Sequence, residues 1–234
     1  MKTVLITGVG TGIGKETCLK FLKEGYKVVG VLRNQTHVAS LNKDASSLAQ
    51  NMKLVFADLE DVQFVSKVME QLVQLKVNNL VSLINVAGIL NTSSFDQYAL
   101  PEMEKVMRVN FSNPALLIAK SFPLLKSGRG NVVNITSMSG YQGSVRFPGL
   151  GIYGASKAAL GSISESLASE FQEHNLHINA LAIGSVNTQM LRKAFPDFQA
   201  AISAPDMANY IFSFATHGYR FHNGKTISVA ITNP

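Results

Sequence analysis

Tyr153 and Lys157 are the two residues whose types and spacing point most directly to chemistry. On a helix, a separation of four residues places both side chains on one face, about one turn apart. A lysine ammonium in that position favours the phenolate and lowers the tyrosine pKa from its ordinary value of about 10. A tyrosine so tuned can exchange a proton with a substrate oxygen near neutral pH. The spacing alone fits an exposed Tyr and an exposed Lys equally well, so the surrounding elements must decide.

The stretch from Gly149 to Ser169, which carries this pair, has the pattern of a helix. Alanines and leucines recur in it at helical spacing. Small residues such as Gly154 and Gly161 would allow a bulky group to lie close to this helix. The helical spacing therefore predicts that Tyr153 and Lys157 share one face, and the small residues predict room for a ligand beside that helix.

A glycine-rich turn follows an apolar strand at residues 3–7 and precedes an amphipathic helix. This layout directs backbone N–H groups and the positive end of the helix at a phosphate. A nucleoside-triphosphate loop is excluded, because Val9 replaces its first glycine and Glu16 its hydroxyl residue. The common dinucleotide spacing also fails, at Ile13. What fits is a longer turn, whose candidate binding residues are Gly8, Gly10, Thr11, Gly12, Ile13 and Gly14.

The end of the strand at residues 27–32 favours NADP over NAD. An NAD site usually places a carboxylate there to hold the ribose hydroxyls. This chain has Leu32, which accepts no hydrogen bond, followed by Arg33 and Asn34. A guanidinium suits a 2′-phosphate. The alternative is a surface arginine that happens to follow a strand.

Alternating strands and helices predict a parallel, doubly wound sheet, in which ligands bind at the carboxyl ends of the strands. Strands are expected at 3–7, 27–32, 54–57, 80–84, 131–135, 178–183 and 226–230. Residues at or after their ends become candidate ligand contacts: Asp58, Leu59, Asn85, Ala87, Gly88, Ser137, Ile183, Gly184, Val186 and Thr188. Asn110 interrupts a helical pattern at 98–127, and with Pro114 nearby it predicts a kink or a polar role.

Length and composition indicate one large domain with a substantial core, since 46% of the 234 residues are hydrophobic and 15% charged. The single cysteine, Cys18, excludes an internal disulfide. The N-terminus shows neither a signal peptide nor a membrane span, so we expect a cytoplasmic protein without a membrane partner. The net charge of +6 raises the question of nucleic acid, but the basic residues are scattered, which favours a modestly basic surface. No metal site is expected.

Taken together, the motifs resemble the short-chain dehydrogenase/reductase family over essentially the whole chain. The residues that carry the resemblance are Thr7-Gly8-x-x-x-Gly12-Ile13-Gly14, Asp58, Asn85-x-Ala87-Gly88, Asn110, Ser137, Tyr153-x-x-x-Lys157 and Gly184-x-Val186-x-Thr188. The chain departs from the family pattern at Val86, where a second Asn is usual, and at Ile183, where Pro is usual.

The resemblance implies one Rossmann-like domain over residues 1–234, with a seven-stranded parallel sheet, assembled as a homotetramer or homodimer. It implies hydride transfer between NADP(H) and a small alcohol or carbonyl compound. Tyr153 would be the general acid or base and Lys157 would bind the nicotinamide ribose. Ser137 would orient the carbonyl and Asn110 would hold a water in the proton relay.

Two questions stay open at this level. A non-catalytic NAD(P)-binding regulator on the same fold is the alternative function, although such relatives typically lose the Tyr, Lys or Ser that this chain retains. The substrate is undetermined, because Arg146 suits an anionic group and Phe147 an apolar one. Residues 189–204 are expected to form a substrate flap, whose Phe195 and Phe198 fit either a pocket or a core.

Overall fold

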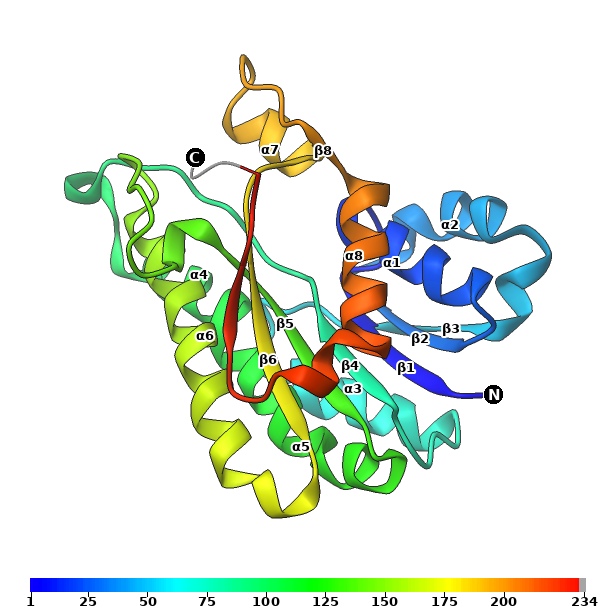
Figure 1. Ribbon diagram of the computed structural model, residues 1–234. Helices are drawn as coiled ribbons and strands as arrows, with labels where there is room; N and C mark the ends of the chain where they lie inside the picture. The colour runs from blue at the N-terminus through cyan, green and yellow to red at the C-terminus, as the bar shows by residue number, and fades with distance from the viewer. Residues whose placement is uncertain (232–234) are drawn as a thin grey trace.

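Seven parallel strands form the central sheet of the computed structural model, which describes residues 1–231 (Figure 1). Their order across the sheet is β3-β2-β1-β4-β5-β6-β9, which confirms the predicted doubly wound topology. The strands are β1 (Thr3–Thr7), β2 (Lys27–Leu32), β3 (Met52–Phe56), β4 (Ser82–Asn85), β5 (Asn131–Ser137), β6 (His177–Ile183) and β9 (Thr226–Val229). Because the strand order reverses between β1 and β4, a crevice opens beyond their carboxyl ends.

Helices cover both faces of the sheet, as Figure 1 shows. One face packs on α1 (Gly12–Lys23), α2 (Val38–Ala45) and α8 (Ala204–Thr216), and the other on α3 (Phe64–Gln74), α5 (Asn113–Gly128) and α6 (Gly151–Glu170). Phe21 of α1 and Phe64 of α3 are among the largest fully buried side chains of the two layers. Burial on both faces explains why β1 and β2 consist mainly of Val, Ile and Leu.

The helical pattern predicted at 98–127 forms one run with a local change of winding. It comprises α4 (Leu100–Met107), a π-helical segment (Arg108–Ser112) and α5. Asn110 lies in the π-helical segment, so the predicted irregularity is a π-bulge, a feature often found at functional sites. Between β2 and β3, α2 is a short helix flanked by 3-10 turns.

Beyond the carboxyl end of β6, the chain forms a separate projection that carries the predicted flap (Figure 1). It contains β7 (Val186–Asn187), α7 (Gln189–Ala194) and β8 (Ile202–Ser203), and β7 pairs with β8 as a two-stranded parallel sheet. Thr188 begins α7, because its Oγ1 accepts a hydrogen bond from the Leu191 N–H at 3.3 Å. Within residues 1–231, each helix is too short or too polar to cross a bilayer.

Candidate active site

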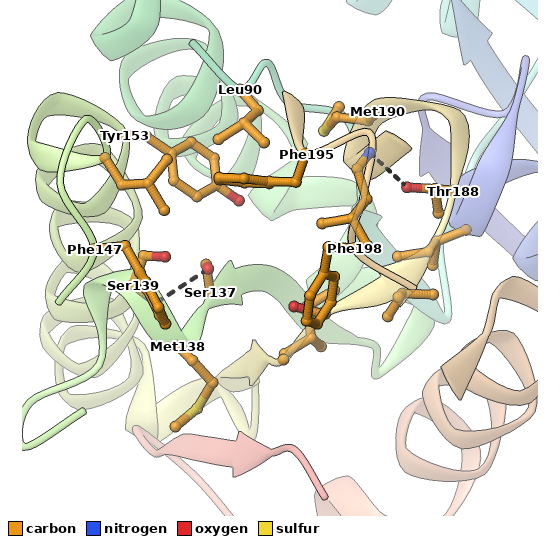
Figure 2. A pocket seen from close by; sticks show the side chains of 17 residues that line it. Leu90, Ser137, Met138, Ser139, Phe147, Tyr153, Thr188, Met190, Phe195 and Phe198 are labelled. Atoms are coloured by element: carbon orange, nitrogen blue, oxygen red, sulfur yellow. Dashed lines mark hydrogen bonds between the residues drawn. The ribbon is translucent and has the colours of Figure 1, made fainter. Parts of the chain in front are cut away.

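The side chains of Ser137 and Tyr153 converge on one cavity at the carboxyl end of the sheet (Figure 2). Ser137 ends β5, and Tyr153 lies in the first turn of α6. Two glycines allow these elements to approach closely: a Cβ at Gly154 would lie 2.6 Å from the Ser139 carbonyl oxygen, and one at Gly140 would lie 2.6 Å from the Ala158 nitrogen. Larger residues at either position would separate the two hydroxyls.

Tyr153 does not have the lowered pKa that the sequence predicts. Burial raises the pKa of its phenol above the ordinary value of 10, and the neighbouring Ser137 hydroxyl offsets part of this rise. The prediction considered only the charge of Lys157, whereas burial disfavours the phenolate and is the largest cause of the shift. In this structure, therefore, Tyr153 is a neutral proton donor near pH 7.

Lys157 lies one turn further along α6, and 5% of its surface is exposed. Its ammonium donates to the backbone carbonyl of Ile135 on β5, at 2.9 Å. Desolvation lowers the pKa of Lys157 from 10.5 to about 8, so the cation still predominates at neutral pH. Gly88 leaves one side of this ammonium open, since a Cβ there would lie 3.2 Å from Nζ.

Asn110 is fully buried and binds two neighbouring segments together. Its Oδ1 accepts from the N–H of Ile89 at 2.8 Å, and its Nδ2 donates to the Ile89 carbonyl at 2.9 Å. The second Nδ2 hydrogen is donated to Ser156 Oγ on α6, at 3.1 Å. Both side-chain hydrogens are thus bonded within the protein, and Asn110 connects the segment after β4 to the helix of Tyr153.

The glycine-rich turn fits the phosphates of a dinucleotide. A Cβ at Gly14 would lie 2.2 Å from the Gly8 carbonyl oxygen, and one at Gly8 would lie 2.9 Å from the Ala87 Cα. Gly12 begins α1 with φ of +56°, a conformation that L side chains rarely adopt. Among the described residues, no side chain caps α1 and no acidic residue occupies its first turn. Its N–H groups are therefore free to bind an anion.

The segment after β4 is held against the glycine turn by a residue that the sequence did not assign to the site. Thr7 Oγ1 accepts from the backbone N–H groups of Val86 and Ala87, at 3.1 and 3.2 Å. The side chain of Asn85 is buried in the sheet and donates to Asn134 Oδ1 at 2.8 Å, which links the ends of β4 and β5. Its contact with a ligand remains a prediction.

The candidate adenosine contacts lie at the ends of β2 and β3. Arg33 is exposed, and within residues 1–231 it forms no ion pair. Asn34 Oδ1 accepts from the N–H of Thr36 at 3.1 Å, and Asp58 Oδ1 accepts from the N–H of Glu60 at 2.9 Å. Asn113 donates to the carbonyl of Leu59, the residue after Asp58, at 2.8 Å.

The cavity around Tyr153 and Ser137 has a volume of about 240 Å³. Of the predicted contacts it includes Ile13, Ile183, Gly184, Val186 and Thr188, and the flap adds Met190, Leu191, Phe195 and Phe198. The flap aromatics therefore line a pocket, which settles one of the open alternatives (Figure 2). Ser139 and Ser185 also line it, and the lining residues that the sequence analysis missed are Leu90, Met138 and Leu150. Apolar side chains in irregular segments carry no pattern that would have selected them.

Comparison with known proteins identifies the class. The family model for short chain dehydrogenase matches residues 2–199. L-xylulose reductase of Caenorhabditis elegans is 32% identical over 202 residues, covering 84% of this chain and 76% of the relative. The NADPH-dependent pterin aldehyde reductase of Arabidopsis thaliana is 31% identical over 208 residues, covering 88% and 83%.

Solved structures share the architecture over nearly the whole chain. The structure described as ElxO with NADP bound superposes with a TM-score of 0.86 at 27% identity, covering 98% of this chain and 97% of that one. A 4-hydroxyisoleucine dehydrogenase complexed with NADH has a TM-score of 0.87 at 23% identity, which shows the fold alone. A doubly wound sheet with a tyrosine and lysine beside its crevice thus defines an oxidoreductase class. The chain belongs to the short-chain dehydrogenase family.

Proposed function

We propose that this protein transfers a hydride between NADP(H) and a small alcohol or carbonyl compound, with Tyr153 as the general acid or base. One observation carries the proposal: the hydroxyls of Ser137 and Tyr153 face a single cavity, and the buried ammonium of Lys157 lies one helical turn from the phenol. A carbonyl oxygen placed between the two hydroxyls would accept a hydrogen bond from each.

In the reducing direction, Ser137 orients the carbonyl and Tyr153 gives its proton to the oxygen. Because burial raises the pKa of the phenol, the proton is present on Tyr153 before reaction in this direction. NADPH, when bound, would supply the hydride to the carbonyl carbon. In the oxidising direction the same residue would take the proton from the alcohol.

Lys157 stabilises the charge that remains on Tyr153 after proton transfer. Its pKa of about 8 leaves it mainly protonated at neutral pH, and its burial reduces the screening of its charge by solvent. The open side of the ammonium at Gly88 also suits a ribose hydroxyl as acceptor. Asn110 helps to position both Tyr153 and Lys157, because its hydrogen bond to Ser156 fixes the helix α6 that carries them.

The preference for NADP rests on the end of β2. Arg33 is exposed and has no carboxylate partner within residues 1–231, so its guanidinium is available to a 2′-phosphate. The strand ends at Leu32 without the carboxylate that would hold the ribose hydroxyls of NAD. Solved structures of similar proteins hold NADP in one case and NADH in another, so the proposed preference depends on Arg33 and Leu32.

The test is the Tyr153→Phe variant, assayed by NADPH absorbance on a panel of carbonyl compounds. We expect turnover to fall by at least about 100-fold, because general acid catalysis is lost. NADPH binding, followed by fluorescence, should persist. Tyr210→Phe is the matched control, since Tyr210 is exposed on α8 outside the cavity. Full turnover by Tyr153→Phe would disprove the catalytic assignment.

A further inference from the structure

The loops that form the cavity separate their charged residues from their apolar ones. Residues 141–149 and 189–200 contain four charged side chains: Arg146, Arg192, Lys193 and Asp197. Within residues 1–231, none of the four lines the cavity around Tyr153. The same loops contribute Phe147, Phe195 and Phe198 to its wall. This division is the opposite of what a pocket for an anionic substrate requires.

Specific contacts hold two of the cations away from the cavity. The Arg146 guanidinium donates to the backbone carbonyl of Ser139 and lines a neighbouring groove, which shares Phe147 with the cavity. On α7, the Arg192 guanidinium donates to the side-chain oxygen of Asn187. In the sequence, Arg146 was the residue that favoured an anionic substrate. Because it does not line the cavity, it no longer supports that substrate class.

Aromatic side chains border the cavity that contains the reacting hydroxyls. Figure 2 shows Phe195 beside Tyr153, with Phe147 and Phe198 bordering the same cavity. The turn after α7 brings the two flap phenylalanines together, since the Phe198 N–H donates to the Phe195 carbonyl at 3.2 Å. Met138, Leu90 and Met190 complete an apolar surface around the polar pair. Thioether and aromatic side chains pack well against an aromatic ligand.

We propose that the substrate is an uncharged carbonyl compound whose carbonyl carries an aromatic or bulky hydrocarbon group. This inference rests on the proposed function, because it assigns the substrate class of the same site. The hydrocarbon part packs against Phe147, Phe195 and Phe198, while the carbonyl oxygen reaches Ser137 and Tyr153. A carboxylate or phosphate against these side chains would lose part of its hydration without gaining a cationic partner.

The experiment compares two aldehydes of similar shape, 4-isopropylbenzaldehyde and 4-formylbenzoate, with NADPH. We expect kcat/KM to be at least about 100-fold higher for the isopropyl compound, because a carboxylate is costly to desolvate in an apolar wall. Equal or higher kcat/KM for 4-formylbenzoate would overturn the inference and leave the oxidoreductase assignment intact.

A charge-introducing variant tests the location. Phe198→Arg should reduce the preference by at least about tenfold, since the new guanidinium can pair with the carboxylate. Phe221→Arg is the control, because Phe221 is 84% exposed and lies outside the cavity lining. If Phe198→Arg leaves the ratio of kcat/KM for the two aldehydes unchanged, the substrate does not contact Phe198 and the inference is overturned.

Should neither aldehyde be turned over, the proposed function is contradicted for this substrate pair, and binding then decides the inference. The protein would first be saturated with NADP. It would then be titrated in a calorimeter with 4-isopropylbenzyl alcohol or with 4-(hydroxymethyl)benzoate. Tighter binding of the isopropyl alcohol, weakened by Phe195→Ala, supports the apolar pocket. Absence of that preference overturns it.

Discussion

The buried ammonium of Lys157 should make the stability of this protein depend on pH in a calculable way. Desolvation lowers its pKa in the folded protein from 10.5 to about 8. The unfolded chain therefore binds more protons than the folded protein between these two values, and the free energy of unfolding rises with pH across the window. Below pH 8 the penalty for holding the cation inside the fold is fully present.

The magnitude follows from the size of the depression in pKa. A shift from 10.5 to about 8 lowers stability at pH 7 by roughly 3 kcal/mol relative to an unperturbed lysine. At pH 9.5 most of the folded molecules carry a neutral Lys157, and the penalty falls to roughly 1 kcal/mol. The difference, about 2 kcal/mol, is large beside the marginal stability of an ordinary domain.

Lys157→Met removes this titration, so the comparison of the two proteins isolates it. Urea unfolding at several pH values between 7 and 9.5 should show wild-type stability rising relative to the variant by about 2 kcal/mol. The variant also leaves the Ile135 carbonyl without its partner, which adds an offset that does not vary with pH. Lys53→Met, at an exposed position on β3, corrects for the loss of a lysine as such. Parallel curves for wild type and Lys157→Met would refute the reasoning.

Two further predictions concern the supports of the site. Ser156→Ala leaves a buried Nδ2 hydrogen of Asn110 unpaired, so stability to urea should fall by about 1–3 kcal/mol. If Ser156 positions the catalytic helix, kcat should fall while NADPH binding is kept; unchanged kcat would refute that role. Arg33→Ala should weaken NADPH binding by about tenfold or more in fluorescence titration, since a charge-assisted hydrogen bond is lost. Tighter binding of NADH than NADPH by the wild-type protein would refute the assignment of Arg33.

The sheet could be predicted from the sequence because the signals for it are local. Each strand is a short apolar run, and helical patterns with glycine or polar residues separate the runs. Alternation of this kind leaves only a few topologies for parallel strands. The strand ends then follow, and with them the approximate positions of Ser137 and Gly184.

The pKa of Tyr153 could not be predicted, because it depends on burial by segments distant in sequence. Charge proximity is visible from the spacing of Tyr153 and Lys157, whereas desolvation requires knowing how closely the rest of the chain packs around the phenol. The same limit applies to Asn85, whose partner Asn134 lies 49 residues away on the neighbouring strand. Sequence motifs identified these residues without showing which way their side chains point.

The sequence also could not show whether Phe147 or Arg146 faces the cavity. Phe147 and Arg146 are adjacent in the chain, and their types favour opposite substrates. In the structure, Phe147 lines both the cavity with Tyr153 and the neighbouring groove, while Arg146 lines only the groove and donates to the Ser139 carbonyl. Loop conformation decides this, and no periodic pattern encodes it.

The energetic cost of Lys157 also bears on the alternative of a binding protein without catalysis. A buried ammonium whose hydrogen bond goes to a single backbone carbonyl destabilises the fold at neutral pH, and a neutral side chain could fill the same space on α6. Strongly perturbed groups of this kind concentrate where a charge is needed for function. A protein that only bound the dinucleotide could use this ammonium for a ribose hydroxyl, but it would not need a phenol one turn away. Catalysis needs both, because the phenolate that proton transfer leaves behind requires a positive charge that water cannot screen.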